Sequence, residues 1–304
     1  MDRRITSAAA HAWRLSCVGV LMLFLWLPGV ACSPSGVEQA TMTVAVTLLP
    51  QAGFVKAVGG ERVDVVVMVP PGASPHTYEL TPEQMVRLSQ ADVYVKVGTP
   101  VEFEVVWLDR LVAANDDMLV VDCSRGVDLI HANDEQDADH DHHGVDPHIW
   151  LSVSNAIIMV ENICEGLVQV DSSNEAYYRA NCAAYVAQLT GLQEELGESM
   201  ASLDGGTFIV FHPSFGYFAR DYGLTQVAVE QGGGEPDAQY IVRLVQEATA
   251  QGARVVFASP QLSTRSAEVI AAEIDADVVI IDPLAADYIP NMRAIAEAIS
   301  QVVQ

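Results

Sequence analysis

Basic residues are scarce in this 304-residue sequence, which has only two lysines, Lys56 and Lys96, and 15 lysines and arginines in total. They stand against 40 aspartates and glutamates, so the formal net charge at pH 7 is −25. A field of this sign repels phosphate backbones and anionic membrane surfaces. It therefore excludes nucleic acid as an expected partner and favours cationic ligands, or simply solubility.

The N-terminus lacks an apolar run long enough to cross a bilayer, because Leu15–Leu27 is too short. This run follows Arg3, Arg4 and Arg14, and a basic segment before a short apolar run is typical of a signal peptide. We therefore predict that residues 1–31 are a cleaved signal peptide and that the mature protein works outside the cytoplasm.

The small residues Gly29-Val30-Ala31 lead into Cys32 and then into a flexible Ser-Pro-Ser-Gly stretch. This segment resembles a bacterial lipobox, although Gly29 stands where such boxes usually carry leucine. The resemblance implies that Cys32 is the acylated first residue of a membrane-anchored mature protein. Ordinary cleavage after Ala31 is the alternative, and it gives the same compartment.

Cysteine is sparse as well, with five residues and no C-x-x-C pair, so a cysteine-ligated zinc site is not expected. Cys123, Cys164 and Cys182 remain in the mature body. Cys164 and Cys182 could form a disulfide between neighbouring helices in an oxidising compartment, or they could stay buried free thiols. The sequence leaves both possibilities open.

From Thr43 onward, short apolar runs alternate with helical stretches, which is typical of parallel sheets covered by helices. A first α/β unit has predicted strands at Thr43–Leu49, Val63–Val69, Asp92–Val97 and Met118–Cys123. A second unit has predicted strands at Thr207–Phe211, Gln226–Val229, Arg254–Ala258 and Asp277–Ile281.

Between the two units, residues 131–146 are acidic, contain histidines and show no apolar periodicity, so they are predicted to form a loop. Helices follow at Val153–Gln169 and Asn174–Leu203, and the second is long enough to link two lobes. The predicted organisation is an N-terminal α/β lobe at 32–170, a linking helix at 171–204 and a C-terminal α/β lobe at 205–304. Strand-end loops of two such lobes would surround a ligand cleft.

Four residues of metal-ligand type follow apolar runs or the acidic loop: His76, His148, His212 and Asp282. Three imidazoles and one carboxylate make a four-coordinate set that suits Zn²⁺. Any one of them alone is more often a hydrogen-bonded structural residue, and an Asp-Pro pair is most often a turn. Their shared position at strand ends is what favours a metal site.

These residues lie in ordered segments that resemble the zinc and manganese substrate-binding proteins of ABC transporters. The segments are PPGASPHTYEL, DPHIWLS, FHPSFGYFARDYGL, EQGGGEPDAQ, SPQLSTRSAEVIA and DPLAADYIPNM. The resemblance runs from about Thr43 to the C-terminus. It implies two α/β lobes with parallel sheets, a long rigid linking helix, one metal in the interlobe cleft and an ABC permease in the membrane as the partner of a monomer.

Carried over by position, the family's metal ligands fall on His76, His148, His212 and Asp282. A histidine at the third position accompanies zinc-type receptors, whereas glutamate accompanies many manganese-type receptors, so His212 favours Zn²⁺ over Mn²⁺. Residues His140, His142 and His143 resemble the auxiliary histidine-rich loop of zinc-type members. Incidental histidines in a solvated acidic loop are the alternative.

The predicted function is thus a high-affinity zinc receptor rather than an enzyme, with a manganese receptor of the same family as the alternative. A zinc hydrolase is a more distant alternative, since it would need an open coordination position and a general base, with Glu79 or Glu230 as candidates. Four protein ligands argue against it. We expect Glu79 to support His76 by a hydrogen bond, and Glu230 could face the cleft.

Overall fold

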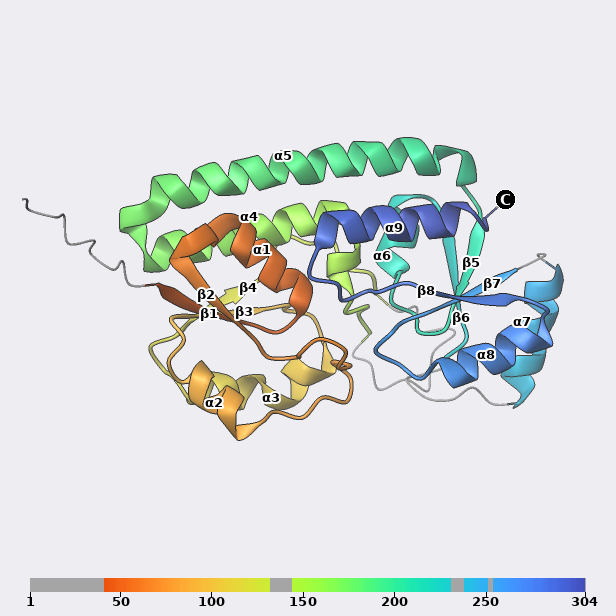
Figure 1. The fold of residues 1–304 in the computed structure, drawn as a ribbon, viewed down its shortest axis with the longest axis horizontal. Helices are drawn as coiled ribbons and strands as arrows, with labels where there is room; N and C mark the ends of the chain where they lie inside the picture. The colour runs from red at the N-terminus through yellow and green to blue at the C-terminus, as the bar shows by residue number, and fades with distance from the viewer. Residues whose placement is uncertain (1–40, 132–143, 231–237, 251–253, 304) are drawn as a thin grey trace, which may run out of the picture. The chain divides into compact units, whose positions relative to one another are not determined.

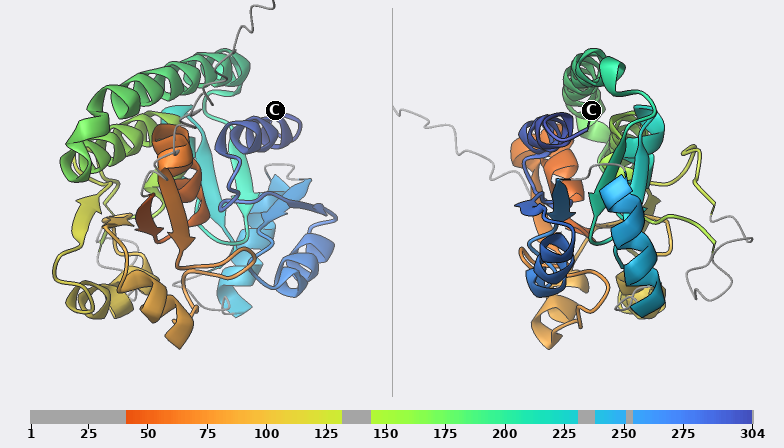
Figure 2. Two further views of the ribbon diagram at one scale, coloured as in Figure 1. Left: turned by 60° about the vertical axis from the view of Figure 1, so that its left-hand side comes forward. Right: turned by 90° about the vertical axis from the view of Figure 1, so that its right-hand side faces the viewer.

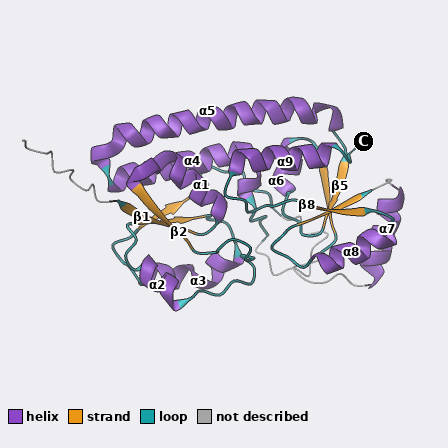
Figure 3. Cartoon of the chain, in the orientation of Figure 1, coloured by secondary structure: helices purple, strands orange, loops and turns teal. Residues whose placement is uncertain are grey.

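The structure is a computed structural model that describes residues 41–131, 144–230, 238–250 and 254–303 (Figure 1). The described chain forms two four-stranded parallel sheets, each flanked by helices (Figure 3). The predicted α/β class with two parallel-sheet lobes joined by a long helix is confirmed.

The first lobe is built on a sheet with the strand order β2-β1-β3-β4. Its strands are β1 (Met42–Val46), β2 (Val63–Val67), β3 (Val93–Lys96) and β4 (Leu119–Asp122). Its helices are α1 (Leu49–Gly59), α2 (Pro82–Leu88), α3 (Glu102–Ala113) and α4 (Val153–Val170). Helices α1 and α4 lie on one side of this sheet, and α2 and α3 lie on the other (Figure 1).

The second lobe repeats this arrangement with the strand order β6-β5-β7-β8. Its strands are β5 (Thr207–Val210), β6 (Thr225–Ala228), β7 (Val255–Ala258) and β8 (Asp277–Ile280). Its helices are α6 (Gly216–Asp221), α7 (Ala238–Ala250), α8 (Thr264–Glu273) and α9 (Tyr288–Ser300). The central strands of both sheets carry buried valine and isoleucine side chains, because helices cover both faces of each sheet.

The linking helix α5 (Glu175–Met200) is 26 residues long. It packs on α1 and α4 of the first lobe and on α9 of the second (Figures 1 and 2). Its buried side chains, which include Leu189, Leu192 and Leu196, recur at three- and four-residue spacing. This stripe joins the main hydrophobic core, which also contains residues of both sheets.

One predicted boundary differs from the structure near a proline. The strand predicted over Thr43–Leu49 ends at Val46, and α1 already begins at Leu49. Pro50 suits the first helical turn because its missing N–H would have no intrahelical acceptor there. The side chain of Gln51 accepts a hydrogen bond from the N–H of Leu48 over 2.9 Å, which caps the helix. Helix α9 (Tyr288–Ser300) likewise has a proline, Pro290, in its first turn.

Helix α4 is long and apolar enough to cross a membrane by composition alone. However, it packs against α1, α5, β3 and β4, and Met159, Val160 and Ile163 are fully buried, so it is a core helix. Cys164 on α4 and Cys182 on α5 are both buried free thiols in the structure, as is Cys123. Of the two possibilities that the sequence leaves open for this pair, the structure has the unpaired one.

Candidate metal centre

His76 lies in the loop after β2 and is held by the first lobe. Its Nδ1 is 2.7 Å from Oε2 of Glu102, the first residue of α3. The loop is tied to the same helix, because the N–H of Phe103 donates to the carbonyl of Pro75 over 3.1 Å. The imidazole of His76 is 21% exposed, so it faces the cleft while its Nδ1 is fixed.

His148 lies between an Asp-Pro pair and the 3₁₀ turn Ile149–Leu151, which leads into α4. The main-chain N–H and the Nδ1 of His148 both contact Oδ1 of Asp146, over 2.9 and 2.8 Å. The ring of Trp150 packs edge to face on the imidazole at 5.4 Å between centroids. His148 is therefore buried and held in one orientation.

His212 follows β5, in the second lobe. Its Nδ1 is 2.6 Å from Oε2 of Glu230, which follows the neighbouring strand β6. The two loops are joined where the strands end, since the N–H of Glu230 donates to the carbonyl of Phe211 over 2.8 Å. Both side chains are 14% exposed.

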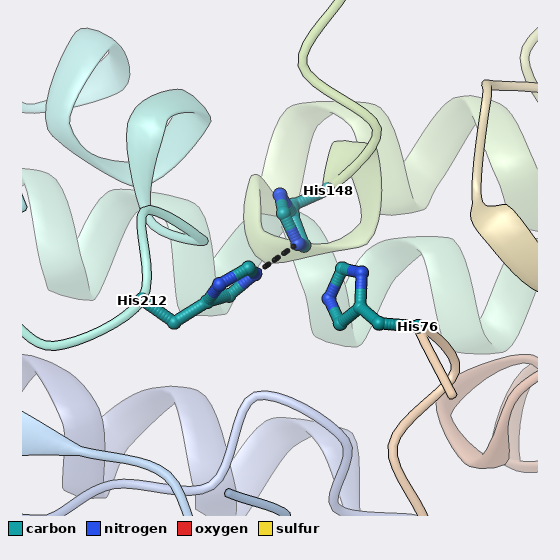
Figure 4. A group of neighbouring side chains, drawn as sticks. All are labelled: His76, His148 and His212. Carbon is teal, nitrogen blue, oxygen red and sulfur yellow. Dashed lines mark hydrogen bonds between the residues drawn. The ribbon is translucent and has the colours of Figure 1, made fainter. Parts of the chain in front are cut away.

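The three imidazoles come from three separate loops and point toward one another (Figure 4). The ring centroids of His76 and His212 are 4.6 Å apart, those of His148 and His212 are 5.2 Å apart, and those of His76 and His148 are 6.0 Å apart. One ligand atom from each residue lies within 4.8 Å of the others. The loops after β2 and β5 and the segment before α4 thus bring these three histidines together.

The protonation of the rings follows from their partners. Each Nδ1 faces a carboxylate oxygen, which can only accept a hydrogen bond when ionised, so Nδ1 carries a proton and Nε2 is the ring atom that can act as a metal ligand. The Nε2 atoms of His148 and His212 are 3.3 Å apart. Two nitrogens bound to one tetrahedral zinc at about 2.0–2.1 Å are separated by about 3.3–3.4 Å. The spacing therefore fits a shared metal ion.

The electrostatics of the site also favour a divalent cation. Burial lowers the pKa of His212 below its usual value, and the hydrogen bond to Glu230 opposes this shift only in part. A lowered pKa keeps the imidazole neutral and able to bind metal. The carboxylates of Glu102, Asp146 and Glu230 place negative charge behind the three rings, which attracts a cation into the cleft.

Asp282 follows β8, and the group of converging ligand atoms does not include it. Its Oδ1 accepts hydrogen bonds from Nε2 of Gln261 over 2.6 Å and from the N–H of Leu284 over 2.8 Å. Gln261, Pro283 and Leu284 line the same pocket as the three histidines. Asp282 is thus held at the edge of this pocket by the β8–α9 loop.

The carboxylate that contacts His76 differs from the predicted one. Glu79 is exposed, and no hydrogen bond within the described part of the chain joins it to His76, whose partner is Glu102. Glu102 lies 26 residues beyond His76 on a helix, so no local pattern indicates it. Asp146 could have been found from its place two residues before His148. Glu230 contacts the site through Nδ1 of His212 and lies behind this ring.

Other predicted functional residues lie outside the described residues. They are the auxiliary loop histidines His140, His142 and His143, the lipobox Cys32 and the signal peptide at 1–31.

Comparison with known proteins gives a consistent result. The zinc-binding lipoprotein AdcA of Streptococcus pneumoniae serotype 4 is 27% identical over 265 residues, which are 84% of this chain and 52% of AdcA. The chain thus spans about half the length of that relative. The high-affinity zinc uptake system protein ZnuA of Bacillus subtilis strain 168 is 29% identical over 249 residues, which are 79% of this chain and 78% of ZnuA.

A crystal structure of a ZnuA deletion mutant with zinc bound is 40% identical and has a TM-score of 0.80, covering 86% of this chain and 98% of that one. Residues 44–302 match the family described as zinc-uptake complex component A, periplasmic, in which the protein is a substrate-binding component of transport. Because this match includes both lobes and all of the converging histidines, the chain belongs to the ZnuA family.

Proposed function

We propose that this protein is an extracytoplasmic receptor that binds Zn²⁺ in the cleft and delivers it to an ABC permease in the membrane. The observation that carries the proposal is the convergence of three imidazoles, each with its Nδ1 against a carboxylate, which leaves Nε2 as the ligand atom. His76, His148 and His212 supply three ligands, and neutral imidazole nitrogens suit zinc better than the oxygen-preferring Mn²⁺.

Asp282 is proposed as the fourth ligand. Its Oδ1 is engaged by Gln261 and Leu284, whereas no described residue makes a hydrogen bond to its Oδ2. Its hydrogen-bond partner Gln261 and the next residue, Pro283, line the pocket that the histidines share, which supports a role for this carboxylate at the site. A carboxylate ligand would leave a bound Zn²⁺ with one net positive charge and close its tetrahedral coordination.

A closed site of four protein ligands supports transport rather than catalysis, because catalytic zinc usually keeps an open position. Of the two candidate general bases, Glu230 is hydrogen-bonded to His212 and Glu79 is exposed. Neither is therefore placed to activate a water at the metal. We propose no enzymatic activity. The protein must instead release its bound zinc when it docks on the permease.

The proposal also includes a lipid anchor on Cys32 and a zinc-binding role for the auxiliary loop. Relatives described as lipoproteins support acylation of Cys32, which the mass of the mature protein would test. His140, His142 and His143 are proposed to bind zinc weakly and to feed the cleft, which would make them dispensable for tight binding. The crystal structure of a ZnuA deletion mutant with zinc bound supports retention of the metal site in a shortened relative.

The experiment that tests this function is a competitive titration of the chain from about residue 36 with Zn²⁺ and Mn²⁺, followed by elemental analysis. We expect one tightly bound zinc that excess manganese does not displace. A variant without residues 133–144 should retain this zinc and lose only weaker binding. Preferential binding of manganese, or no stoichiometric metal, would contradict the zinc proposal.

The carboxylates behind the histidines are expected to set the affinity. Replacing Glu230 by alanine removes the acceptor of the His212 Nδ1 proton, so the ring can turn and change tautomer. We expect zinc affinity to fall by about 10- to 100-fold, as when comparable outer partners of metal ligands are removed. Isothermal titration with a competing chelator would measure this change.

Glu79→Ala is the matched control, because it removes an exposed carboxylate three residues from a ligand without touching an imidazole. Its zinc affinity should equal that of the unaltered protein. A loss of zinc affinity in Glu79→Ala but not in Glu230→Ala would contradict this prediction and assign the supporting role to Glu79.

A further inference from the structure

His148 belongs by sequence to the first half of the chain, yet its surroundings include helix α6 of the second lobe. The fully buried Tyr217 on α6 accepts a hydrogen bond from the N–H of Ile130 over 3.1 Å and donates one to the carbonyl of Asp146 over 2.9 Å. Ile130 and Asp146 are also joined directly, because the N–H of Asp146 donates to the carbonyl of Ile130 over 2.9 Å. One tyrosine of the second lobe thus holds both ends of the segment that carries the acidic loop.

Gly216, the residue before Tyr217, lies directly against the side chain of Asp146. Gly216 begins α6, and a Cβ atom there would lie 2.4 Å from Oδ2 of Asp146 and 3.8 Å from Cδ1 of Ile130. Real Cβ atoms do not come this close to an oxygen, so any side chain at this position would displace the carboxylate. Asp146 occupies its observed position because Gly216 has no side chain.

The other oxygen of the same carboxylate, Oδ1, contacts both the main-chain N–H and the Nδ1 of His148. We propose that Gly216 and Tyr217 are positioning residues for the metal site: through Asp146, helix α6 of the second lobe sets the orientation of His148. This inference rests on the proposed function, because it assigns these residues a part in zinc binding at the same site.

The other two histidines differ in this respect. The carboxylate partner of His76 lies on α3 of the first lobe, and the partner of His212 lies beside it in the second lobe. The first lobe also contacts the segment of His148, since Oγ1 of Thr99 donates to the carbonyl of Pro147 over 2.7 Å. However, the carboxylate that orients the His148 ring packs on α6. The orientation of His148, whose Nε2 lies 3.3 Å from that of His212, therefore depends on contacts with the second lobe as well as the first.

A double-mutant cycle on the full mature chain tests this assignment. Gly216→Ala should push the Asp146 carboxylate away from His148 and weaken zinc binding by about 10- to 100-fold. In an Asp146→Ala background the same glycine substitution has no carboxylate to displace, so it should cause no further loss. Such non-additivity separates an effect through Asp146 from a general structural effect, which would add in both backgrounds.

Gly191→Ala is the matched control, because a Cβ at this exposed position of α5 meets no atom within 4 Å. It should leave zinc affinity unchanged. The visible spectrum of bound Co²⁺ provides a second readout, since a displaced His148 should weaken the absorption of the tetrahedral ion in Gly216→Ala but not in Gly191→Ala. Unchanged zinc affinity in Gly216→Ala, or equal losses in the two backgrounds, would overturn the proposal.

Tyr217→Phe serves if Gly216→Ala does not fold. It removes one hydroxyl from a buried ring and leaves the Ile130 N–H and the Asp146 carbonyl without this partner. Zinc affinity should fall, because the main chain that leads from Asp146 to His148 loses this contact with α6. Failure of the unaltered chain to bind zinc would refute the proposed function itself, whereas tight binding by both the unaltered chain and Tyr217→Phe would refute only the role of α6.

Discussion

Replacing His148 by alanine should abolish tight zinc binding while leaving the protein folded. The substitution removes the Nε2 atom that lies 3.3 Å from Nε2 of His212, so a metal ion in the cleft loses one of its two closest-spaced ligands. We expect the loss to exceed the roughly 100-fold that removal of an outer carboxylate can cause, because a direct zinc bond is lost. Competition against a chelator of known affinity would measure the effect.

His131→Ala is the appropriate control for this substitution. His131 is an exposed histidine at the other end of the same segment, paired with Val145, and it is not among the converging ligand atoms. Its zinc affinity should match that of the unaltered chain. If His148→Ala still bound one zinc with the original affinity, the assignment of the metal centre to this cleft would be wrong.

Replacing Trp150 by alanine should produce the largest loss of stability. Its side chain is 2% exposed, it packs on His148, and its Nε1 donates to the carbonyl of Pro283 in the second lobe over 2.8 Å. Removing a buried aromatic ring typically lowers the free energy of unfolding by about 3–5 kcal/mol. Urea unfolding of the metal-free protein would measure this loss, since bound zinc would stabilise the folded state and mask it.

Two further variants separate the ring from its hydrogen bond. Trp150→Phe keeps an aromatic ring but leaves the Pro283 carbonyl without its donor, which should cost about 1–3 kcal/mol. Trp107→Ala removes a partly buried tryptophan that lies beside Arg110, and it should cost less than Trp150→Ala. An unfolding midpoint for Trp150→Ala equal to that of Trp107→Ala would show that Trp150 does not join the two lobes.

The sequence predicts the fold well because buried parallel strands give a simple signal. Runs such as Val93–Lys96 and Val255–Ala258 consist mainly of valine and other apolar residues, as expected where both sheet faces are covered. The linking helix was also predictable from its three- and four-residue apolar spacing. The error lies at the end of the first strand, which was predicted to reach Leu49 although α1 begins there with Pro50 in its first turn.

Less of the metal centre than of the fold could be predicted from the sequence. Strand ends indicate His76 and His212, because loops at the carboxyl ends of parallel strands are the usual ligand sites of α/β sheets, and the family resemblance indicates all three histidines. The partner of His76 was not predictable, since Glu102 comes from a distant helix and only the folded chain places it 2.7 Å from the ring. Nearness in sequence suggested Glu79, which the fold turns toward solvent.

The clasp formed by Ile130, Asp146 and Tyr217 has a consequence for the length of the segment between residues 131 and 145. Both ends of that segment are held by contacts that do not involve the residues between them. The positions of Asp146 and His148 are therefore set independently of how many residues, and how many histidines, lie between 131 and 145 in the sequence.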